Sequence, residues 1–474
     1  MRPLEILLPF VLALYLVWPL FGRRRPPAVG VLPAFGLVIV VTHGRVEGFR
    51  WQMLPLYLLT AVAFIVSLTE FLRAQKGKAG DFSRPRGWNL AGLLLTLGLL
   101  AVSTVLPALL PVPRLPAPSG PYPLGTRTIE LTDASRQELY SGRDEPRRFL
   151  VQIWYPAVRP ALEAQPAPWM PEAALVAPSI SAYLHFPPFF LDHLALARSN
   201  AYPNLAAERS GGPYPVLIFA HGWNGFRQQS TFLMQELASH GYIVAAVEFP
   251  YGGRLTVFPD GTLAPNNPAA LPSGLPEAEY EAAARILVDQ WARDIGYTLD
   301  NLTQINQADS EGQLTGLLDL QKVGVFGHST GGGATIQFCS TDARCTAGLT
   351  LDAFMRPVGL KALDQGTQQP FFYMFSELWP FERNTELFDR YYGHVDPTNR
   401  VVTILGADHY DFSDLPALSP LAPQLGLKGP INGARVQQII DTYVLAFFDQ
   451  QFKGIPSPLF SGPQADYPEV RYDH

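Results

Sequence analysis

The stretch that decides the fold is Val323-Gly-Val-Phe-Gly-His-Ser-Thr-Gly-Gly-Gly-Ala334, in which an apolar run meets a Gly-x-Ser-x-Gly pentapeptide centred on Ser329. A helix-compatible run follows, so the order is strand, sharp turn, helix. This order exposes the serine hydroxyl at a strained turn, and the flanking glycines let neighbouring backbones pass closely. The pentapeptide alone also suits a plain glycine-rich turn, but the flanking strand and helix favour a nucleophilic serine.

A serine hydroxyl is a weak nucleophile until a base takes its proton and a third group orients that base. In doubly wound hydrolases these partners follow in the order Ser, Asp or Glu, His, each after a strand. Asp352 directly follows the strand-like run 347–351, and His409 lies in the loop after the run 400–405. The sequence therefore predicts a catalytic triad of Ser329, Asp352 and His409.

Other ionisable residues lie close to these positions. His394 precedes its nearest strand and is expected at the opposite edge of the sheet, and His328 is expected to point away from the task of the neighbouring serine. Asp408 and Asp411 flank His409 and cannot readily orient it from such close positions. The simple alternative for each of them is a surface carboxylate.

Acyl transfer also needs N–H donors for the developing oxyanion. One is expected from Thr330, directly after the nucleophile, and the other from a loop after an early strand. His221-Gly-Trp223 follows the buried-strand run 216–220, which makes the Trp223 N–H the second candidate. The alternative for this His-Gly pair is an ordinary turn.

The composition changes along the chain. After a Pro-rich segment at 110–123, short strand-like runs alternate with amphipathic helices, which predicts an α/β domain with a largely parallel sheet. Residues 155–212 are rich in proline and aromatics without a clear period, so we interpret them as a lid, a substrate wall or a disordered insertion. A net charge of −6 and the absence of a dense basic patch after the first quarter argue against nucleic-acid binding.

The first hundred or so residues are much more apolar than the rest. A spanning helix needs about 20 apolar residues, or about 17 at the short end. We predict four spans, with three spans and a re-entrant piece as the alternative. Glu5 and Glu70 lie at run edges, where we expect them to reach water. The runs are Leu4–Phe21, Pro27–Thr42, Trp51–Leu72 and Asn89–Val112.

Basic residues between the runs predict the orientation. The connections after the first and third runs carry eight lysines and arginines, whereas the opposite side carries four. The positive-inside rule then places both termini and the C-terminal domain outside the cytoplasm, in a multi-pass cell-membrane protein. A cleaved signal peptide is disfavoured, because Arg23-Arg-Arg25 follows the first run where a small-x-small cleavage site would stand.

The two cysteines, Cys339 and Cys345, are six residues apart. In an oxidising compartment a disulfide between them is expected to stabilise the fold by about 2 kcal/mol. The alternative is two buried thiols, and the lack of further suitable ligands nearby argues against a zinc site.

The C-terminal part resembles the plasma-type, calcium-independent platelet-activating-factor acetylhydrolase family of α/β-hydrolases. The likeness covers roughly residues 120–454 in order, and the first hundred residues lie outside it. Departures from the family pattern are Thr330, where a bulkier apolar residue is common, and Phe249, where some similar proteins have histidine. The matching pieces are Phe219-Ala-His-Gly-Trp-Asn-Gly-Phe-Arg227, Ala238-Ser-His-Gly-Tyr-Ile-Val-Ala-Ala-Val-Glu248, Gly327-His-Ser-Thr-Gly-Gly332, Gly348-Leu-Thr-Leu-Asp-Ala353 and His409-Tyr-Asp-Phe-Ser-Asp414.

This resemblance implies the same triad and oxyanion donors as the strand order does, without a metal or an organic cofactor. We therefore expect a transmembrane region over 1–112, a linker over 113–125 and an α/β-hydrolase domain over 126–474. The expected activity is that of a membrane-anchored serine esterase acting on lipid or short-acyl esters. The alternatives are a related hydrolase of polyester, amide or other non-lipid acyl bonds, and a non-catalytic partner-binding protein. The sequence leaves the oligomeric state open.

Overall fold

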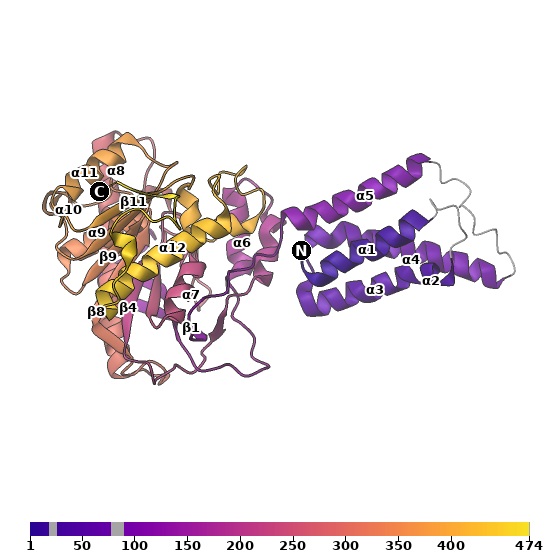
Figure 1. Cartoon of the computed structure of the whole chain (residues 1–474), viewed down its shortest axis with the longest axis horizontal. Coiled ribbons are helices and arrows are strands. Elements are labelled where there is room, and N and C mark those ends of the chain that lie inside the picture. The colour runs from indigo at the N-terminus through magenta and orange to yellow at the C-terminus, as the bar shows by residue number, and fades with distance from the viewer. Residues whose placement is uncertain (19–25, 77–89, 474) are drawn as a thin grey trace. The chain divides into compact units, whose positions relative to one another are not determined.

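The computed structural model describes residues 1–18, 26–76 and 90–473, which form two compact units (Figure 1). The smaller unit comprises Met1–Pro113, Asp192–Leu196 and Leu418–Leu421, and the larger one Arg114–Leu191, Ala197–Ala417 and Ala422–His474.

The larger unit is built on a ten-stranded sheet in the order β12-β11-β10-β9-β8-β4-β5-β2-β1-β3. The six neighbouring strands from β11 to β5 are parallel, while β12 and β2 pair antiparallel to their neighbours. A separate two-stranded sheet pairs β6 (Leu255–Val257) with β7 (Leu263–Pro265). The strands of the large sheet are β1 (Leu124–Gln137), β2 (Pro146–Pro156), β3 (Ala201–Pro203), β4 (Tyr214–Ala220), β5 (Ile243–Glu248), β8 (Leu318–His328), β9 (Ala347–Leu351), β10 (Phe371–Ser376), β11 (Arg400–Ile404) and β12 (Val470–Tyr472).

Helices cover both faces of this sheet (Figure 1). Because side chains alternate along a strand, Val216 and Ile218 of β4 enter one core and Leu217 and Phe219 the other. The run over 216–220 is therefore apolar throughout, as in other strands buried on both faces. One core contains residues of α7 (Thr231–Ser239) and α12 (Gly433–Phe448), and the other contains residues of α8 (Glu277–Gln307), α9 (Thr330–Thr341), α10 (Leu360–Gln365) and α11 (Glu382–Tyr392).

The mostly parallel sheet flanked by helices confirms the predicted α/β architecture and fits an α/β-hydrolase. Two differences from the predictions bear on the site. Strand β10 was missed, and the segment 155–212 is not without regular structure, because it contains α6 (Ala173–Tyr183) and the 3₁₀ segment η4 (Pro188–Leu196). Pro178 lies inside α6, and a proline in a short apolar helix conceals its period in the sequence.

The smaller unit is helical. By length and composition, two of its helices could cross a membrane, Pro27–Gly48 and Trp51–Gln75; among the described residues Pro3–Val17 and Leu94–Leu109 are apolar but shorter. The end of the first predicted run and several basic residues used for the orientation, such as Arg23–Arg25 and Lys78, lie outside the described residues. Its elements are α1 (Pro3–Val17), α2 (Pro27–Gly30), α3 (Leu32–His43), η2 (Gly44–Gly48), η3 (Trp51–Met53), α4 (Leu54–Gln75) and α5 (Leu90–Leu109).

Glu5 of α1 does not reach water, contrary to expectation. Its side chain is fully buried, and both carboxylate oxygens accept hydrogen bonds from Arg50 at 2.7 Å. Arg50 also donates to the Pro107 carbonyl of α5 at 3.2 Å. A buried carboxylate is tolerated only when it is paired. Arg50, one of the four basic residues assigned above to the outer side, pairs with Glu5 and thereby joins α1 to α5.

Candidate active site

The Ser329 turn has the geometry of a strained elbow between β8 and α9. Ser329 adopts φ 55° and ψ −122°, a conformation that non-glycine residues rarely take. A Cβ on Gly327 would overlap the Gly331 carbonyl, and one on Gly331 would overlap the Ala220 carbonyl at the end of β4. The two glycines of the pentapeptide are therefore required by close backbone packing on either side of the serine.

Asp352 and His409 lie directly together. The Asp352 carboxylate is 1% exposed, and its Oδ2 lies 2.8 Å from His409 Nδ1. Ser376, at the end of β10, donates to Asp352 through its backbone N–H at 3.0 Å and its hydroxyl at 2.7 Å. A carboxylate that accepts from every side requires the His409 ring to carry its proton on Nδ1, which leaves Nε2 able to accept one.

Backbone hydrogen bonds place the Ser329 turn beside Asp352. The Ser329 N–H donates to the Leu351 carbonyl at 3.0 Å, and the Phe354 N–H donates to the Ser329 carbonyl at 2.9 Å. The predicted residues thus gather at the carboxyl ends of β8, β9 and β11. Among the described residues no hydrogen bond joins the Ser329 hydroxyl to His409, a contact that often tightens only when substrate binds.

An aromatic wall adjoins His409. The Trp379 ring stacks on His409 with a centroid distance of 3.8 Å and an interplanar angle of 23°. Phe354 and Phe381 contact Trp379 edge-on at 6.4 and 5.0 Å. This wall packs against one face of the imidazole and presents apolar surface next to the predicted triad.

The two predicted oxyanion donors flank Ser329. Thr330 is the first residue of α9, so no carbonyl one turn earlier in the helix is available to its N–H. Gly222, directly before Trp223, passes so close to Ser329 that an added Cβ would lie 3.0 Å from the serine Cβ. The Thr330 N–H thus lacks a partner within the helix, and the backbone just before Trp223 lies beside the Ser329 side chain.

The loop carrying His409 is held by carboxylates for which a surface position was the simple alternative. Asp411 is fully buried, and its Oδ2 accepts from the N–H groups of Asp408 and Gly429 at 2.9 and 2.8 Å, so for Asp411 that alternative is wrong. Asp408 accepts from the His409 N–H at 2.7 Å. In a tight loop, short acidic side chains satisfy the backbone donors that no regular structure pairs.

Asp414 fixes the end of the same loop. It accepts from the Thr231 and Phe232 N–H groups at the start of α7, at 2.8 and 3.2 Å, and from the Trp169 indole at 3.1 Å. The carboxylate caps the helix and joins it to the segment 155–212. This segment is therefore joined to the loop that carries His409.

His221 is fully buried behind the Trp223 loop and is expected to make the fold acid-sensitive. The Phe249 N–H donates to its Nε2 at 3.2 Å and its Nδ1 lies 2.7 Å from the Gly222 carbonyl, which fits a neutral ring. Burial lowers the pKa of His221 to about 4, below the unfolded value of about 6.5. The contribution of neutral His221 to the free energy of unfolding is therefore complete above the unfolded pKa. It is lost as the pH falls towards the folded pKa, because the unfolded chain then binds a proton that the folded chain does not.

Between pH 7 and pH 5 this single group should reduce the free energy of unfolding by about 2 kcal/mol. Chemical denaturation of the detergent-solubilised full chain at both pH values, with His221→Gln as the matched variant, measures that difference. Equal pH dependence in the two proteins would contradict this assignment.

Cys339 at the end of α9 and Cys345 before β9 form a disulfide, with their sulfurs 1.98 Å apart.

A different group has a spacing that suits a metal: ligand atoms of Glu5, His43 and Glu47 lie within 4.8 Å of one another. Because two arginines, Arg2 and Arg50, already neutralise Glu5, we interpret this group as an ion-pair network.

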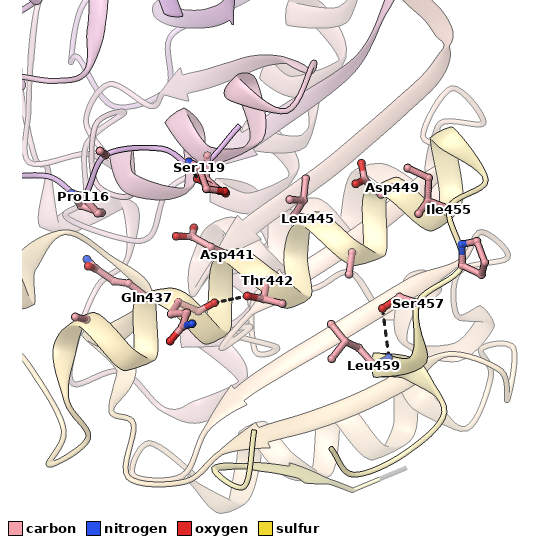
Figure 2. Close-up of a pocket in the computed structure, with 16 residues that line it drawn as sticks. Pro116, Ser119, Gln437, Asp441, Thr442, Leu445, Asp449, Ile455, Ser457 and Leu459 are labelled. Atoms are coloured by element: carbon pink, nitrogen blue, oxygen red, sulfur yellow. Dashed lines mark hydrogen bonds between the residues drawn. The ribbon is translucent and has the colours of Figure 1, made fainter. Parts of the chain in front are cut away.

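A cavity of about 590 Å³ lies apart from these residues, between 116–119, α7 and α12. Figure 2 shows Asp441 and Leu445 on the side of α12 that faces Ser119, whose N–H donates to Glu236 at 2.8 Å. None of the predicted triad is among the described residues that line it, so this cavity is separate from the candidate active site.

Three contacts of the site were not predicted from the sequence. Ser376 ends the missed strand β10 and Trp379 follows it, and their partners are 24 and 30 positions away in the sequence. The pairing of Gln229 with His328 also links distant segments. Recognising β10 as a strand would have placed Ser376 at the same edge of the sheet as Asp352.

A family model described as "Platelet-activating factor acetylhydrolase, isoform II" matches residues 110–253 and 283–455, more than half of the chain. The chain is 31% identical over 263 residues to the platelet-activating factor acetylhydrolase of Cavia porcellus, a match that covers 52% of this chain and 59% of that protein. The chain thus spans less than two thirds of that relative's length.

The match to a second relative covers a larger share of both chains. It is the "probable 1-alkyl-2-acetylglycerophosphocholine esterase" of Arthroderma benhamiae, 24% identical over 387 residues, covering 75% of this chain and 92% of that one. Among solved structures, a ferulic acid esterase from Streptomyces cinnamoneus superposes with a TM-score of 0.63 and 27% identity, over 77% of this chain and 100% of the other. The family model begins at residue 110, so its match lies almost entirely in the α/β unit.

Proposed function

Because this chain belongs to the platelet-activating factor acetylhydrolase, isoform II, family, we propose that it is a serine esterase that hydrolyses lipid or short-acyl carboxylic esters. The observation that carries this proposal is the 2.8 Å hydrogen bond between Asp352 and His409 beside the strained Ser329 turn. Such a carboxylate, base and hydroxyl at one edge of a sheet is what acyl transfer needs.

In the proposed reaction the Ser329 hydroxyl attacks the ester carbonyl while His409 Nε2 takes its proton. The tetrahedral intermediate collapses, His409 returns the proton to the leaving alcohol, and an acyl-serine remains. Water, deprotonated by the same imidazole, then releases the carboxylic acid and frees the serine. Asp352 holds the imidazole with its proton on Nδ1 and stabilises the imidazolium that forms.

The N–H groups of Trp223 and Thr330 are the proposed oxyanion donors. Removing one such donor typically costs 10²–10³ in kcat, equivalent to about 3–4 kcal/mol. The position of Thr330 at the start of α9 supports this role, since the helix dipole also favours negative charge there.

We further propose that residues 1–112 anchor the enzyme in the cell membrane by four spans, that 113–125 connects them to the catalytic domain, and that this domain faces away from the cytoplasm. Two helices of sufficient length support membrane association. An esterase held at a bilayer would meet substrates that partition into lipid, in keeping with the names of the Cavia porcellus and Arthroderma benhamiae relatives.

The likeness to a ferulic acid esterase supports a second candidate, a hydrolase of non-lipid acyl bonds. A substrate panel separates the two. We expect an sn-2 acetyl choline phospholipid to be hydrolysed about tenfold or more faster than its long-chain counterpart, and faster than a feruloyl ester or an anilide. Faster turnover of the feruloyl ester or the anilide would favour the second candidate.

A fluorophosphonate probe tests the mechanism itself in the same membranes. It should label Ser329, because the probe reacts with serines activated by a neighbouring base. A protein that binds a partner without catalysis would remain unlabelled and would hydrolyse no member of the panel.

A further inference from the structure

We propose that His328, beside the nucleophile, is a positioning residue. It fixes His409, the catalytic base, relative to the loop 221–229 after β4, which carries Trp223 and is called the oxyanion loop below. The proposal rests on the proposed function and goes beyond it, because His328 neither forms a bond nor transfers a proton in that mechanism. Its imidazole is 1% exposed and lies between two loops that arrive from distant parts of the sequence.

Two hydrogen bonds define its role. The Gln229 side-chain amide nitrogen lies 2.7 Å from His328 Nδ1, and His328 Nε2 lies 2.9 Å from the main-chain carbonyl of His409. The rings of His328 and His409 also pack at a centroid distance of 4.4 Å with an angle of 38°. One imidazole therefore contacts both the backbone and the ring of the base.

The protonation state of His328 follows from its partners. An amide nitrogen only donates and a carbonyl oxygen only accepts. His328 Nδ1 must therefore accept a hydrogen bond from Gln229, and His328 Nε2 must carry the ring proton and donate a hydrogen bond to the His409 carbonyl. Burial lowers the pKa of His328 well below its usual value. The ring thus stays neutral, and both hydrogen bonds persist through the pH range in which an esterase works.

Gln229 connects this arrangement to the oxyanion loop. It lies six residues after Trp223, and its side-chain oxygen contacts Gly225 so closely that a Cβ there would overlap it. The Gln229 carbonyl accepts from the Asp414 N–H at 2.7 Å, at the far end of the loop carrying His409. His328 and Gln229 together join the serine turn, the oxyanion loop and the base-carrying loop.

This junction matters because acyl transfer is sensitive to small displacements. A misplacement of about 1 Å can reduce the rate about 100-fold. The bond to Asp352 fixes the His409 ring from one side. The position from which that ring projects is fixed by contacts of the His409 main chain, whose N–H donates to Asp408 and whose carbonyl lies 2.9 Å from His328 Nε2.

The test compares two substitutions of His328 in the full chain. His328→Phe keeps a planar ring of similar size and removes both hydrogen bonds, so kcat for a short p-nitrophenyl ester should fall about 100-fold with KM nearly unchanged. His328→Gln retains an N–H that can reach the His409 carbonyl and should recover about tenfold of that loss. His394→Phe, the same exchange at an exposed position, is the matched control and should leave kcat unchanged.

The Gln229 substitutions test the tautomer. Gln229→Glu replaces the donor by an acceptor, so His328 must carry its proton on Nδ1. A neutral ring then has no proton on Nε2 and loses the hydrogen bond to the His409 carbonyl. It should therefore lower kcat more than Gln229→Met, which only removes the donor. Equal losses in the two variants would overturn the assigned tautomer.

Crystal structures of the wild type and His328→Phe separate this proposal from the proposed function. We expect the His409 backbone to move by about 1 Å and its bond to Asp352 to lengthen. If the wild type hydrolyses no ester, the proposed function fails, whereas this displacement still decides the positioning role. An unmoved His409 together with an unchanged kcat in His328→Phe would overturn the proposal.

Discussion

Ser329→Ala is expected to reduce kcat for a short p-nitrophenyl ester by about 10⁶-fold, the loss measured when the nucleophile of a serine hydrolase is removed. Without the hydroxyl no acyl-enzyme can form, although the oxyanion donors remain and leave a residual rate above that in water. Steady-state kinetics of the purified full chain in detergent measures the effect.

Stability should be unaffected by this change. Alanine keeps the Cβ that Ser329 already carries at φ 55°, and the backbone hydrogen bonds to Leu351 and Phe354 do not involve the hydroxyl. Ser340→Ala on the same helix α9 is the matched control, because its hydroxyl only donates to the Gln337 carbonyl. Turnover by Ser329→Ala at the wild-type rate, with a normal melting temperature, would end the triad assignment.

Asp352→Asn should lower kcat about 10⁴-fold while leaving the fold intact. The carboxylate accepts from the Ser376 N–H, the Ser376 hydroxyl and His409 Nδ1. An asparagine whose oxygen faces the Ser376 N–H turns its amide nitrogen towards His409 Nδ1. The imidazole must then accept at Nδ1 and carry its proton on Nε2, so it cannot take the serine proton.

The kinetic measurement is the same as for Ser329→Ala, with fluorophosphonate labelling as a second readout that should slow in parallel. Asp364→Asn, which alters a carboxylate in an exposed ion pair with Arg390, is the matched control. A loss of less than tenfold in Asp352→Asn would show that another group orients His409.

The sequence allowed the architecture to be predicted where local patterns are strong. The runs 216–220, 347–351 and 400–405 all form strands, and the strand, turn and helix order around Ser329 is present. Each of these elements can be recognised from a few neighbouring residues, through an apolar run or a glycine. The helix α6 was missed because Pro178 interrupts its pattern.

The contacts that orient the candidate site could not be predicted in this way. His328 meets Gln229 and the His409 carbonyl across 99 and 81 positions, and Trp379 stacks on His409 from the segment after β10, a strand that was not recognised. The direction of each side chain depends on how the strands are ordered and how their loops pack, and sequence spacing carries neither.

By itself, therefore, the sequence determined the type of fold, the family, and the three residues on which the proposed chemistry rests. Only the tertiary structure decided which neighbours hold those residues, namely Ser376 on the acid, and His328 and Trp379 on the base. The physical reason is that elements are specified by local periodicity and turn residues, whereas hydrogen bonds between loops exist only after the whole sheet has assembled.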